Sequence, residues 1–167
     1  MHAAARMLGE SGLPVRAASR LHATPAFPAG SGPDYANAVV AVDPGGRDPE
    51  AVLELLHALE ARFGRLRDRR WGPRTLDLDL IAAGDAVRPD PVAWARWHDL
   101  DPAAQQVEAP DRLILPHPRI EDRLFVLMPL AEIAPDWRHP VTGAGIAALI
   151  AAHPPAAREA IRAIGPL

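Results

Sequence analysis

The chain has 167 residues, enough for one domain with a sizeable core, and its apolar fraction of 49% excludes wholesale disorder. A net charge of −3 argues against general binding to nucleic acid or anionic membranes, and the lack of cysteine excludes disulfides and thiolate chemistry. The sequence has no apolar run of membrane-spanning length and no signal-peptide core near its start. We therefore expect a cytoplasmic enzyme.

The first part of the chain predicts a short helix followed by two strands. Residues 1–10 are rich in alanine and have the pattern of a helix end that glycine closes. Residues 14–22 and 35–43 have the composition of strands, and the prolines and glycines of residues 23–34 predict a loop between them. Asn37 shares a strand face with the tyrosine two residues earlier, which is also typical of a simple edge position.

Residues 48–63 have the clearest helical pattern. Asp48 is the expected N-cap, a proline occupies the first helical position, and Gly64 is expected to end the helix. The predicted buried stripe consists of Val52, Leu55, Leu56, Leu59 and Phe63. Glu60 borders this stripe, and His57 lies on the same helix. Periodicity alone favours a solvated position for both side chains.

Residues 74–81 alternate between polar and apolar side chains, which predicts a strand with one buried face. Asp77 and Asp79 then point to one side, and three leucines point to the other. Two neighbouring carboxylates repel each other unless a cation or several donors lie between them. The pair therefore indicates a divalent metal site, although such spacing is also typical of a solvated strand face.

Five arginines precede this acidic pair and surround a Trp-Gly-Pro turn. They are Arg65, Arg67, Arg69, Arg70 and Arg74. Carboxylates bind divalent metal, the metal binds phosphate, and guanidinium groups bind the remaining phosphate charge. Trp71 also indicates function, because a large ring in a surface loop is costly unless it covers something. The combination favours a nucleoside triphosphate bound with Mg²⁺, although an arginine run is also typical of a solvated loop.

The second half of the chain predicts helices with little sheet. Residues 85–112 contain two tryptophans, which predict a long excursion that packs back onto the domain with one or two short helical turns. Residues 113–117 predict a short apolar strand. Three helices are expected at residues 119–133, 142–151 and 155–163. Pro129 interrupts the first of them, and Thr142 is the expected cap of the second. This order of elements favours an α+β fold with a mixed or antiparallel sheet.

Residues 70–81 (RWGPRTLDLDLI) closely resemble the signature of the 6-hydroxymethyl-7,8-dihydropterin pyrophosphokinase family of folate biosynthesis. Four further stretches match the family, at residues 24–27, 33–38, 60–67 and 115–130. The resemblance covers roughly residues 15–140. It implies a ferredoxin-like α/β/α sandwich with a mainly antiparallel sheet, formed as a single domain over residues 1–167. In that domain residues 85–112 are a family-variable insertion, and residues 141–167 are C-terminal helices.

The resemblance also implies a reaction. The β,γ-diphosphate of the co-substrate ATP is transferred to the hydroxymethyl oxygen of the pterin, and AMP is released. Asp77 and Asp79 resemble the ligands of two Mg²⁺ ions. The expected partners are these two small molecules, with neither nucleic acid nor membrane, and the expected state is a monomer.

Further roles follow from the same resemblance. The implied pterin-binding residues are Thr24, Pro25, Phe27, Tyr35, Asn37, Trp71 and Phe125. Tyr35 and Phe125 resemble the pair that sandwiches the pterin ring, Asn37 reads its hydrogen-bonding edge, and Trp71 resembles a lid. The implied catalytic arginines are Arg65, Arg67 and Arg74. The implied ATP contacts are His57, Glu60, Arg74, Arg112, His117 and Arg123.

The sequence departs from the family pattern at its start and at His57. The family opens with a β-strand that ends in a Gly-Ser-Asn-like turn. We expect this central strand to be missing here, either because the start of the chain was assigned too late or because the chain is a fragment. His57 stands where many relatives carry a polar amide. A truncated, inactive relative is therefore one alternative. A metal-dependent nuclease and a ferredoxin-like RNA-binding module are two others, although the acidic net charge and the single candidate aromatic Tyr35 on the strands argue against them.

Overall fold

The computed structural model describes residues 2–25, 32–63 and 76–167. The chain forms two compact units. The first unit comprises residues 1–18, 40–80 and 167, and the second comprises residues 19–39 and 81–166. Within these described ranges, helices are combined with strands that all pair in the antiparallel sense, which confirms the predicted α+β class. The described strands lie in two sheets, one in each unit.

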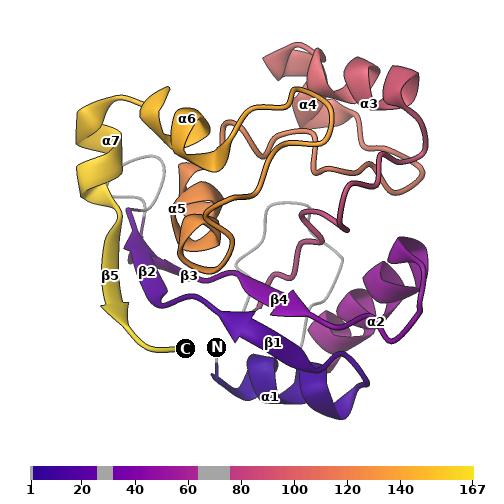
Figure 1. Ribbon diagram of the computed structural model, residues 1–167, viewed down its shortest axis with the longest axis vertical. Helices are drawn as coiled ribbons and strands as arrows, with labels where there is room; N and C mark the ends of the chain where they lie inside the picture. The colour runs from indigo at the N-terminus through magenta and orange to yellow at the C-terminus, as the bar shows by residue number, and fades with distance from the viewer. Residues whose placement is uncertain (1, 26–31, 64–75) are drawn as a thin grey trace. The chain divides into compact units, whose positions relative to one another are not determined.

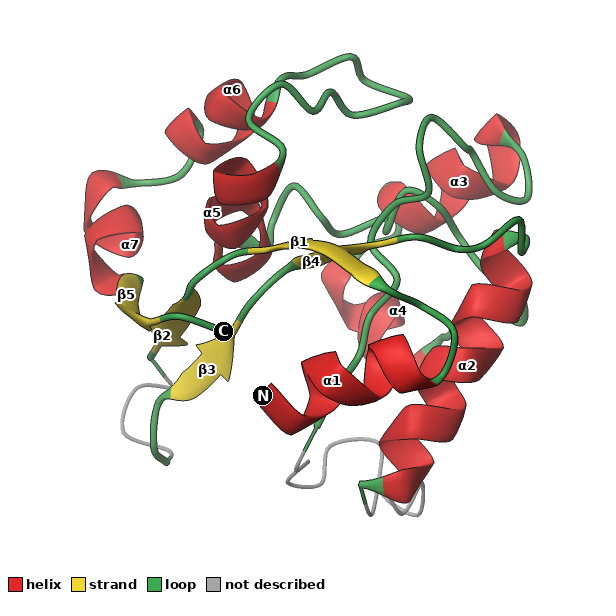
Figure 2. Ribbon diagram, turned by 60° about the horizontal axis from the view of Figure 1, so that its bottom comes forward, coloured by secondary structure: helices red, strands yellow, loops and turns green. Residues whose placement is uncertain are grey.

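The first unit combines a two-stranded sheet with two helices (Figure 2). Its elements are α1 (His2–Glu10), β1 (Val15–Ala18), β4 (Val40–Val42) and α2 (Pro49–Arg62). Both predicted helices are confirmed. The carboxylate of Asp48 accepts a hydrogen bond of 2.8 Å from the amide of Ala51, and this satisfies one of the unpaired amides at the start of α2. The predicted end at Gly64 lies outside the described residues.

An apolar core fills the first unit. Its buried side chains are Leu8, Leu13, Val52, Leu56 and Leu59. Three of these five belong to the predicted stripe of α2, whereas Leu55 is only partly buried. Leu78 and Leu80 pack against the same core. The core therefore holds the segment that carries the two aspartates as well as the helices.

The second unit combines a three-stranded sheet, in the order β3-β2-β5, with five helices among its described residues (Figure 1). Its strands are β2 (Leu21–Thr24), β3 (Tyr35–Asn37) and β5 (Arg162–Gly165). Its helices are α3 (Pro91–His98), α4 (Pro102–Val107), α5 (Leu124–Ile133), α6 (Ile146–Ala151) and α7 (Pro155–Ala160). Helix α5 packs against β2 and β3, and its buried side chains form a core with those of α6. None of the helices in the described part of the chain has the length and apolarity that a membrane span requires.

The predicted strands at residues 14–22 and 35–43 are each interrupted. The first divides into β1 and β2, and the second into β3 and β4. The interruptions lie opposite each other, because the amide of Ser19 donates to the carbonyl of Val39 at 2.9 Å. The hydroxyl of Ser19 accepts from the amide of Val39 at 3.0 Å and donates to the carbonyl of Arg20 at 2.8 Å. These side-chain bonds replace ladder bonds where the chain passes between the two sheets.

The predictions for the second half need four corrections. The expected strand at residues 113–117 is reduced to one antiparallel bridge between Arg88 and Leu115. Helix α5 begins only at Leu124, because hydrogen-bonded turns occupy the residues before it. Gly145, and not Thr142, is the N-cap of α6. The last predicted helix ends at Ala160, and the chain then forms β5, whose pairing with β2 outweighs the local helical pattern.

One prediction about the second half is confirmed, and one more is wrong. The excursion at residues 85–112 contains two short helices, α3 and α4. The prediction that Pro129 interrupts the helix is wrong, because Pro129 lies inside α5 and the helix continues through it. The buried contacts of its neighbours stabilise the helix at this point.

Candidate functional site

The acidic pair lies on an extended segment of the first unit. Leu76 is 7% exposed, and the next two leucines in the alternation pack on the core, while Asp77 and Asp79 are both exposed. The prediction that the two carboxylates share one side is therefore confirmed. The prediction of a strand is wrong for residues 76–81, which have no strand assignment. Burial of every second side chain produces the alternation here without a ladder of backbone hydrogen bonds.

Glu60 holds the backbone between the two aspartates. Its side chain is fully buried, with 0% exposure, and one carboxylate oxygen accepts a hydrogen bond of 2.9 Å from the amide of Leu78. The interpretation of Glu60 as a solvated helix residue is therefore wrong. A buried carboxylate is tolerated only where hydrogen bonds compensate for its lost hydration. The spacing of Glu60 four residues after buried Leu56 was the available signal, because such residues share a helix face.

The chemistry of the acidic pair fits Mg²⁺. Both aspartates offer hard carboxylate oxygens on one exposed side of a segment that packing holds in place. Among the described residues there is no group of three or more His, Asp or Glu side chains that could hold a metal ion. Mg²⁺ is commonly bound by one or two carboxylates together with substrate phosphates, so two aspartates are a sufficient donor set from the protein. His57, three residues before Glu60, is half-buried on the same helix.

Three predicted pterin contacts lie together in the second unit. Thr24 pairs with Tyr35 in the β2–β3 ladder, and the side-chain amide of Asn37 donates to the hydroxyl of Thr24 at 2.9 Å. Alternation along β3 places Tyr35 and Asn37 on the same face. Tyr35 is 62% exposed, which is unusual for so large a ring. Pro25 follows Thr24 and is exposed.

The polar face of this sheet is the face toward α5. His22 pairs with Asn37 in the ladder, and its imidazole Nε2 lies 3.3 Å from a carboxylate oxygen of Glu132, which belongs to α5. Phe125 belongs to the first turn of the same helix and packs partly on the core. The guanidinium carbon of Arg123 lies 6.0 Å from the centre of the Phe125 ring. The helix and the sheet therefore each contribute one of the two predicted aromatic side chains.

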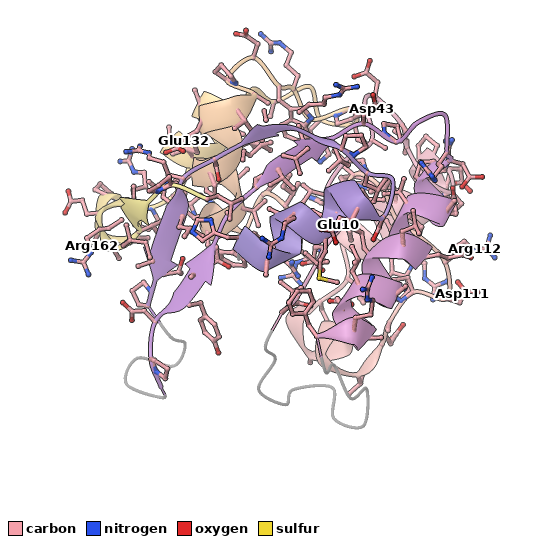
Figure 3. The ribbon with its side chains drawn as sticks, turned by 90° about the horizontal axis from the view of Figure 1, so that it is seen from below. Glu10, Asp43, Asp111, Arg112, Glu132 and Arg162 are labelled. Carbon is pink, nitrogen blue, oxygen red and sulfur yellow. The ribbon has the colours of Figure 1, made fainter. Side chains whose placement is uncertain are left out.

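Glu132, which is labelled in Figure 3, belongs to α5 and binds Arg20, the residue directly before β2. One of its carboxylate oxygens accepts from the backbone amide of Arg20 at 2.8 Å. The other accepts from the guanidinium of Arg20 at 3.0 Å and 2.7 Å. These bonds with Arg20 lower the pKa of Glu132, and they raise the pKa of Arg20. Sequence reasoning missed this pair, because the two residues are 112 positions apart and neither belongs to a local motif.

The predicted nucleotide contacts of the second unit lie in the turn before α5 and near it. The imidazole Nδ1 of His117 accepts from the amide of Arg119 at 3.1 Å. The backbone amide of His117 donates to the carbonyl of Ile81 at 2.8 Å. Arg123 is half-buried, and Arg112 is exposed with its guanidinium 3.5 Å from the carboxylate of Asp111. Five predicted site residues lie outside the described residues, namely Phe27, Arg65, Arg67, Trp71 and Arg74.

Residues 1–135 match the protein family described as 7,8-dihydro-6-hydroxymethylpterin-pyrophosphokinase (HPPK). The chain belongs to this family. Both the acidic pair and the Thr24–Tyr35–Asn37 group lie inside the part that matches HPPK.

Three curated proteins, each named 2-amino-4-hydroxy-6-hydroxymethyldihydropteridine pyrophosphokinase, are similar to the chain. The protein from Synechocystis sp. is 45% identical over 118 residues, which cover 71% of this chain and 50% of that protein. The protein from Methylorubrum extorquens is 40% identical over 102 residues, covering 61% of this chain and 51% of that protein. The protein from Pseudomonas aeruginosa is 39% identical over 122 residues, which cover 73% of this chain and 62% of that protein. The chain therefore spans about half the length of the first two HPPK relatives and somewhat more of the third.

Proposed function

We propose that this HPPK-family chain transfers diphosphate from ATP to 6-hydroxymethyl-7,8-dihydropterin in tetrahydrofolate biosynthesis. The products are the pterin diphosphate and AMP. The observation that carries the proposal is the family match over residues 1–135, which includes two separately ordered groups of polar side chains. One group has the chemistry of a metal and phosphate site, and the other has the chemistry of a site for a flat heterocycle.

The second unit supplies the pterin contacts. A flat ring system binds well between two aromatic faces, which Tyr35 and Phe125 would provide. Asn37 donates one amide hydrogen to Thr24, and this bond orients an amide that still offers a carbonyl oxygen and a second hydrogen. Such a group matches the alternating donors and acceptors at the edge of a pterin. Pro25, and Phe27 and Trp71 outside the described residues, complete the proposed set.

The first unit supplies the metal ligands. Asp77 and Asp79 would hold Mg²⁺, with two ions as the resemblance implies. When bound, Mg²⁺ neutralises the triphosphate and favours attack by the hydroxyl group. Glu60 positions the carboxylates because it holds the amide of Leu78 between them.

The transfer itself exchanges one phosphorus–oxygen bond for another. The hydroxymethyl oxygen of the pterin forms a bond to the β-phosphorus, and the bond from that phosphorus to the oxygen bridging to the α-phosphorus breaks. AMP leaves with this oxygen, and the hydroxyl proton is released. Positioning and charge stabilisation then account for most of the catalysis. The proposed nucleotide contacts are His57, Arg112, His117 and Arg123, together with Arg65, Arg67 and Arg74. The predicted contact of Glu60 with ATP is not proposed again, because its side chain is fully buried and holds the Leu78 amide.

The proposal is tested by measuring AMP release from Mg²⁺ and ATP with and without 6-hydroxymethyl-7,8-dihydropterin. We expect pterin-dependent AMP from the chain and none from a variant that combines Asp77→Ala with Asp79→Ala. Asp85→Ala is the matched control, because Asp85 is another exposed aspartate close by in the sequence. Pterin-independent AMP, or equal rates in all three proteins, would contradict the proposal. Light scattering on the same samples tests the predicted monomer.

A further inference from the structure

The insertion at residues 85–112 is tied to the turn that contains His117. Trp94 is 3% exposed, and its indole N–H donates to the carbonyl of Pro116 at 2.8 Å. Two backbone hydrogen bonds of 2.8 Å and 3.2 Å join Arg88 to Leu115 at the base of the insertion. The first tryptophan of the insertion is thus part of the core, as its burial and its satisfied N–H show. The insertion therefore holds a defined position beside a proposed nucleotide contact.

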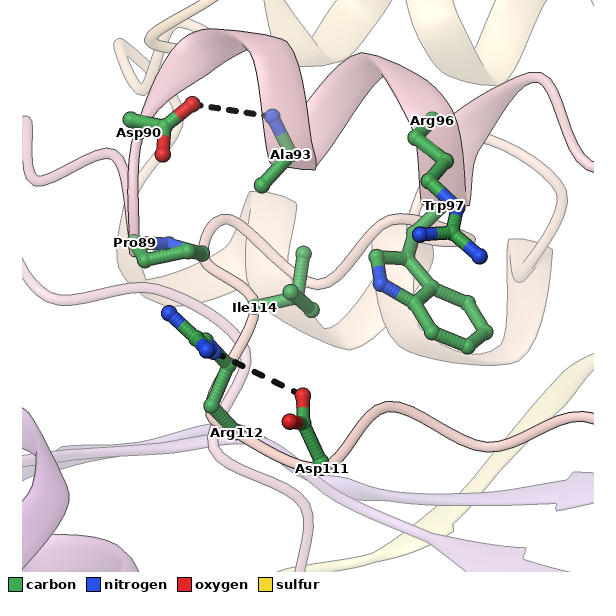
Figure 4. Close-up of a pocket in the computed structure, with 8 residues that line it drawn as sticks. All are labelled: Pro89, Asp90, Ala93, Arg96, Trp97, Asp111, Arg112 and Ile114. Carbon is green, nitrogen blue, oxygen red and sulfur yellow. Dashed lines mark hydrogen bonds and ion pairs between the residues drawn. The ribbon is translucent and has the colours of Figure 1, made fainter.

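The second tryptophan of the insertion lines a pocket. Trp97 is half-buried on α3 and lies with Arg96 at one side of a pocket of about 290 Å³ (Figure 4). Arg112 and Asp111 lie at another side, and Ile114 lies between them (Figure 4). This volume is near the lower limit of small-molecule pockets, so it suits one part of a ligand better than a whole coenzyme.

The lining combines two guanidinium groups with one indole ring. The guanidinium carbon of Arg96 lies 5.8 Å from the centre of the Trp97 ring. Arg112 contacts Asp111 only at 3.5 Å, and both side chains are mostly exposed, so this ion pair is weak. The other acidic group of the pocket, Asp90, is used as the cap of α3 and accepts two backbone hydrogen bonds of 2.9 Å.

This lining matches the two halves of a nucleotide. Guanidinium groups bind phosphoryl oxygens through paired hydrogen bonds. An indole ring offers a face on which a nucleobase stacks.

We propose that Arg96, Trp97 and Arg112 form a subsite for a nucleoside phosphate. The two guanidinium groups bind phosphoryl oxygens, and the Trp97 ring stacks on the base. The inference rests on the proposed function, because that proposal makes Arg112 a contact of ATP. It adds two residues of the insertion, which the family resemblance leaves without a role. The insertion is thereby a determinant of nucleotide affinity in this chain.

Calorimetric titration of the whole chain with Mg²⁺ and ATP, without pterin, tests the subsite. We expect Arg96→Ala and Trp97→Ala each to weaken ATP binding by about tenfold. Trp97→Phe keeps a ring, and its binding should lie between those of the wild-type chain and Trp97→Ala. Val92→Ala is the control, because Val92 belongs to the same helix, is 81% exposed and does not line the pocket. Unchanged binding in Arg96→Ala and Trp97→Ala would overturn the inference, as would a wild-type chain that binds no nucleotide.

Partial ligands separate the two halves of the subsite. Arg96→Ala should weaken the binding of pyrophosphate and reduce its salt dependence, whereas Trp97→Ala should leave both unchanged. Trp97→Ala should weaken the binding of adenosine more than Arg96→Ala does. The opposite assignment of the two effects would overturn the proposed roles.

The same variants distinguish this inference from the proposed function. If the variants lose ATP affinity and the wild-type chain forms no AMP with pterin, the subsite stands and the proposed reaction fails. If the wild-type chain forms AMP and the KM for ATP is the same in Arg96→Ala and Trp97→Ala as in Val92→Ala, the reaction stands and the subsite fails.

Discussion

The two units hold their candidate functional side chains by different means. In the first unit, packing and one buried carboxylate hold Asp77 and Asp79 on a segment without strand pairing. In the second unit, the β2–β3 ladder sets the positions of Tyr35 and Asn37. Regular pairing is thus not needed to place two carboxylates on one side, provided that the leucines that alternate with them pack on the core.

The difference has an energetic consequence. Fully burying a leucine side chain contributes about 1.5–3 kcal/mol to the free energy of unfolding. Buried Leu76 and the partly buried Leu78 and Leu80 therefore stabilise the acidic segment directly. The side chain of Tyr35 is 62% exposed and contributes little to stability. We therefore expect substitutions near the acidic pair to change both stability and activity. Substitutions in the Thr24–Tyr35–Asn37 group should change activity alone.

The largest combined effect is expected for Glu60→Ala. The variant leaves the amide of Leu78 without its carboxylate acceptor, and such a loss costs about 1–3 kcal/mol. The rate of AMP formation should fall by about tenfold or more, because the backbone between the aspartates is no longer held. Urea unfolding and the AMP assay measure the two effects. Glu60→Gln keeps an acceptor oxygen and should recover most of the stability, and an equal loss in both variants would contradict this role.

Tyr35→Ala should weaken pterin binding and leave the fold unchanged. Loss of one of two stacking rings should raise the KM for the pterin by about tenfold, with little change in the KM for ATP. Steady-state AMP formation measures both constants. Ile164→Ala is a matched control, because Ile164 is a 59% exposed side chain on another strand of the same sheet. A loss of unfolding free energy in Tyr35→Ala, or a larger change in the KM for ATP, would contradict the assignment.

A smaller effect concerns how the free energy of unfolding changes at acidic pH. One carboxylate in each unit allows this effect to be tested. Arg20 holds the pKa of Glu132 below its ordinary value of 4.5, chiefly by hydrogen bonding. Arg16 similarly holds the pKa of Asp43 below 3.8 through a short contact. Because both folded-state values are depressed, each ion pair stabilises the chain above the ordinary value, and this stabilisation is lost as the pH falls through the folded-state pKa.

Glu132→Gln should therefore lower the free energy of unfolding at neutral pH and have less effect well below pH 4.5. Asp43→Asn makes the corresponding test for the first unit, and its effect should diminish well below pH 3.8. Urea unfolding across this pH range measures both. A Glu132→Gln effect that stays constant as the pH falls would show that the Arg20 pair does not act through charge.

Local signals explain which features could be predicted from the sequence. The cap of α2 was predictable because Asp48 and its partner amide are three residues apart. The position of Asp77 and Asp79 on the same side of the chain was predictable, because side-chain burial alternates with period two. In contrast, the bond from Leu78 to Glu60 and the pair of Arg20 with Glu132 join distant residues, and only the fold brings them together. The interruptions of two predicted strands were also missed, because they depend on which sheet each half joins.

The central claim is that the first unit serves the metal and the second unit serves the pterin. The most direct test measures AMP formation by Asp79→Asn and by Asn37→Ala while Mg²⁺ and pterin are varied separately. We predict that Asp79→Asn raises the Mg²⁺ concentration for half-maximal rate and leaves the KM for the pterin unchanged. We predict the reverse for Asn37→Ala. If both variants change the same parameter, or if Asn37→Ala alters only the Mg²⁺ requirement, the division between the two units is contradicted.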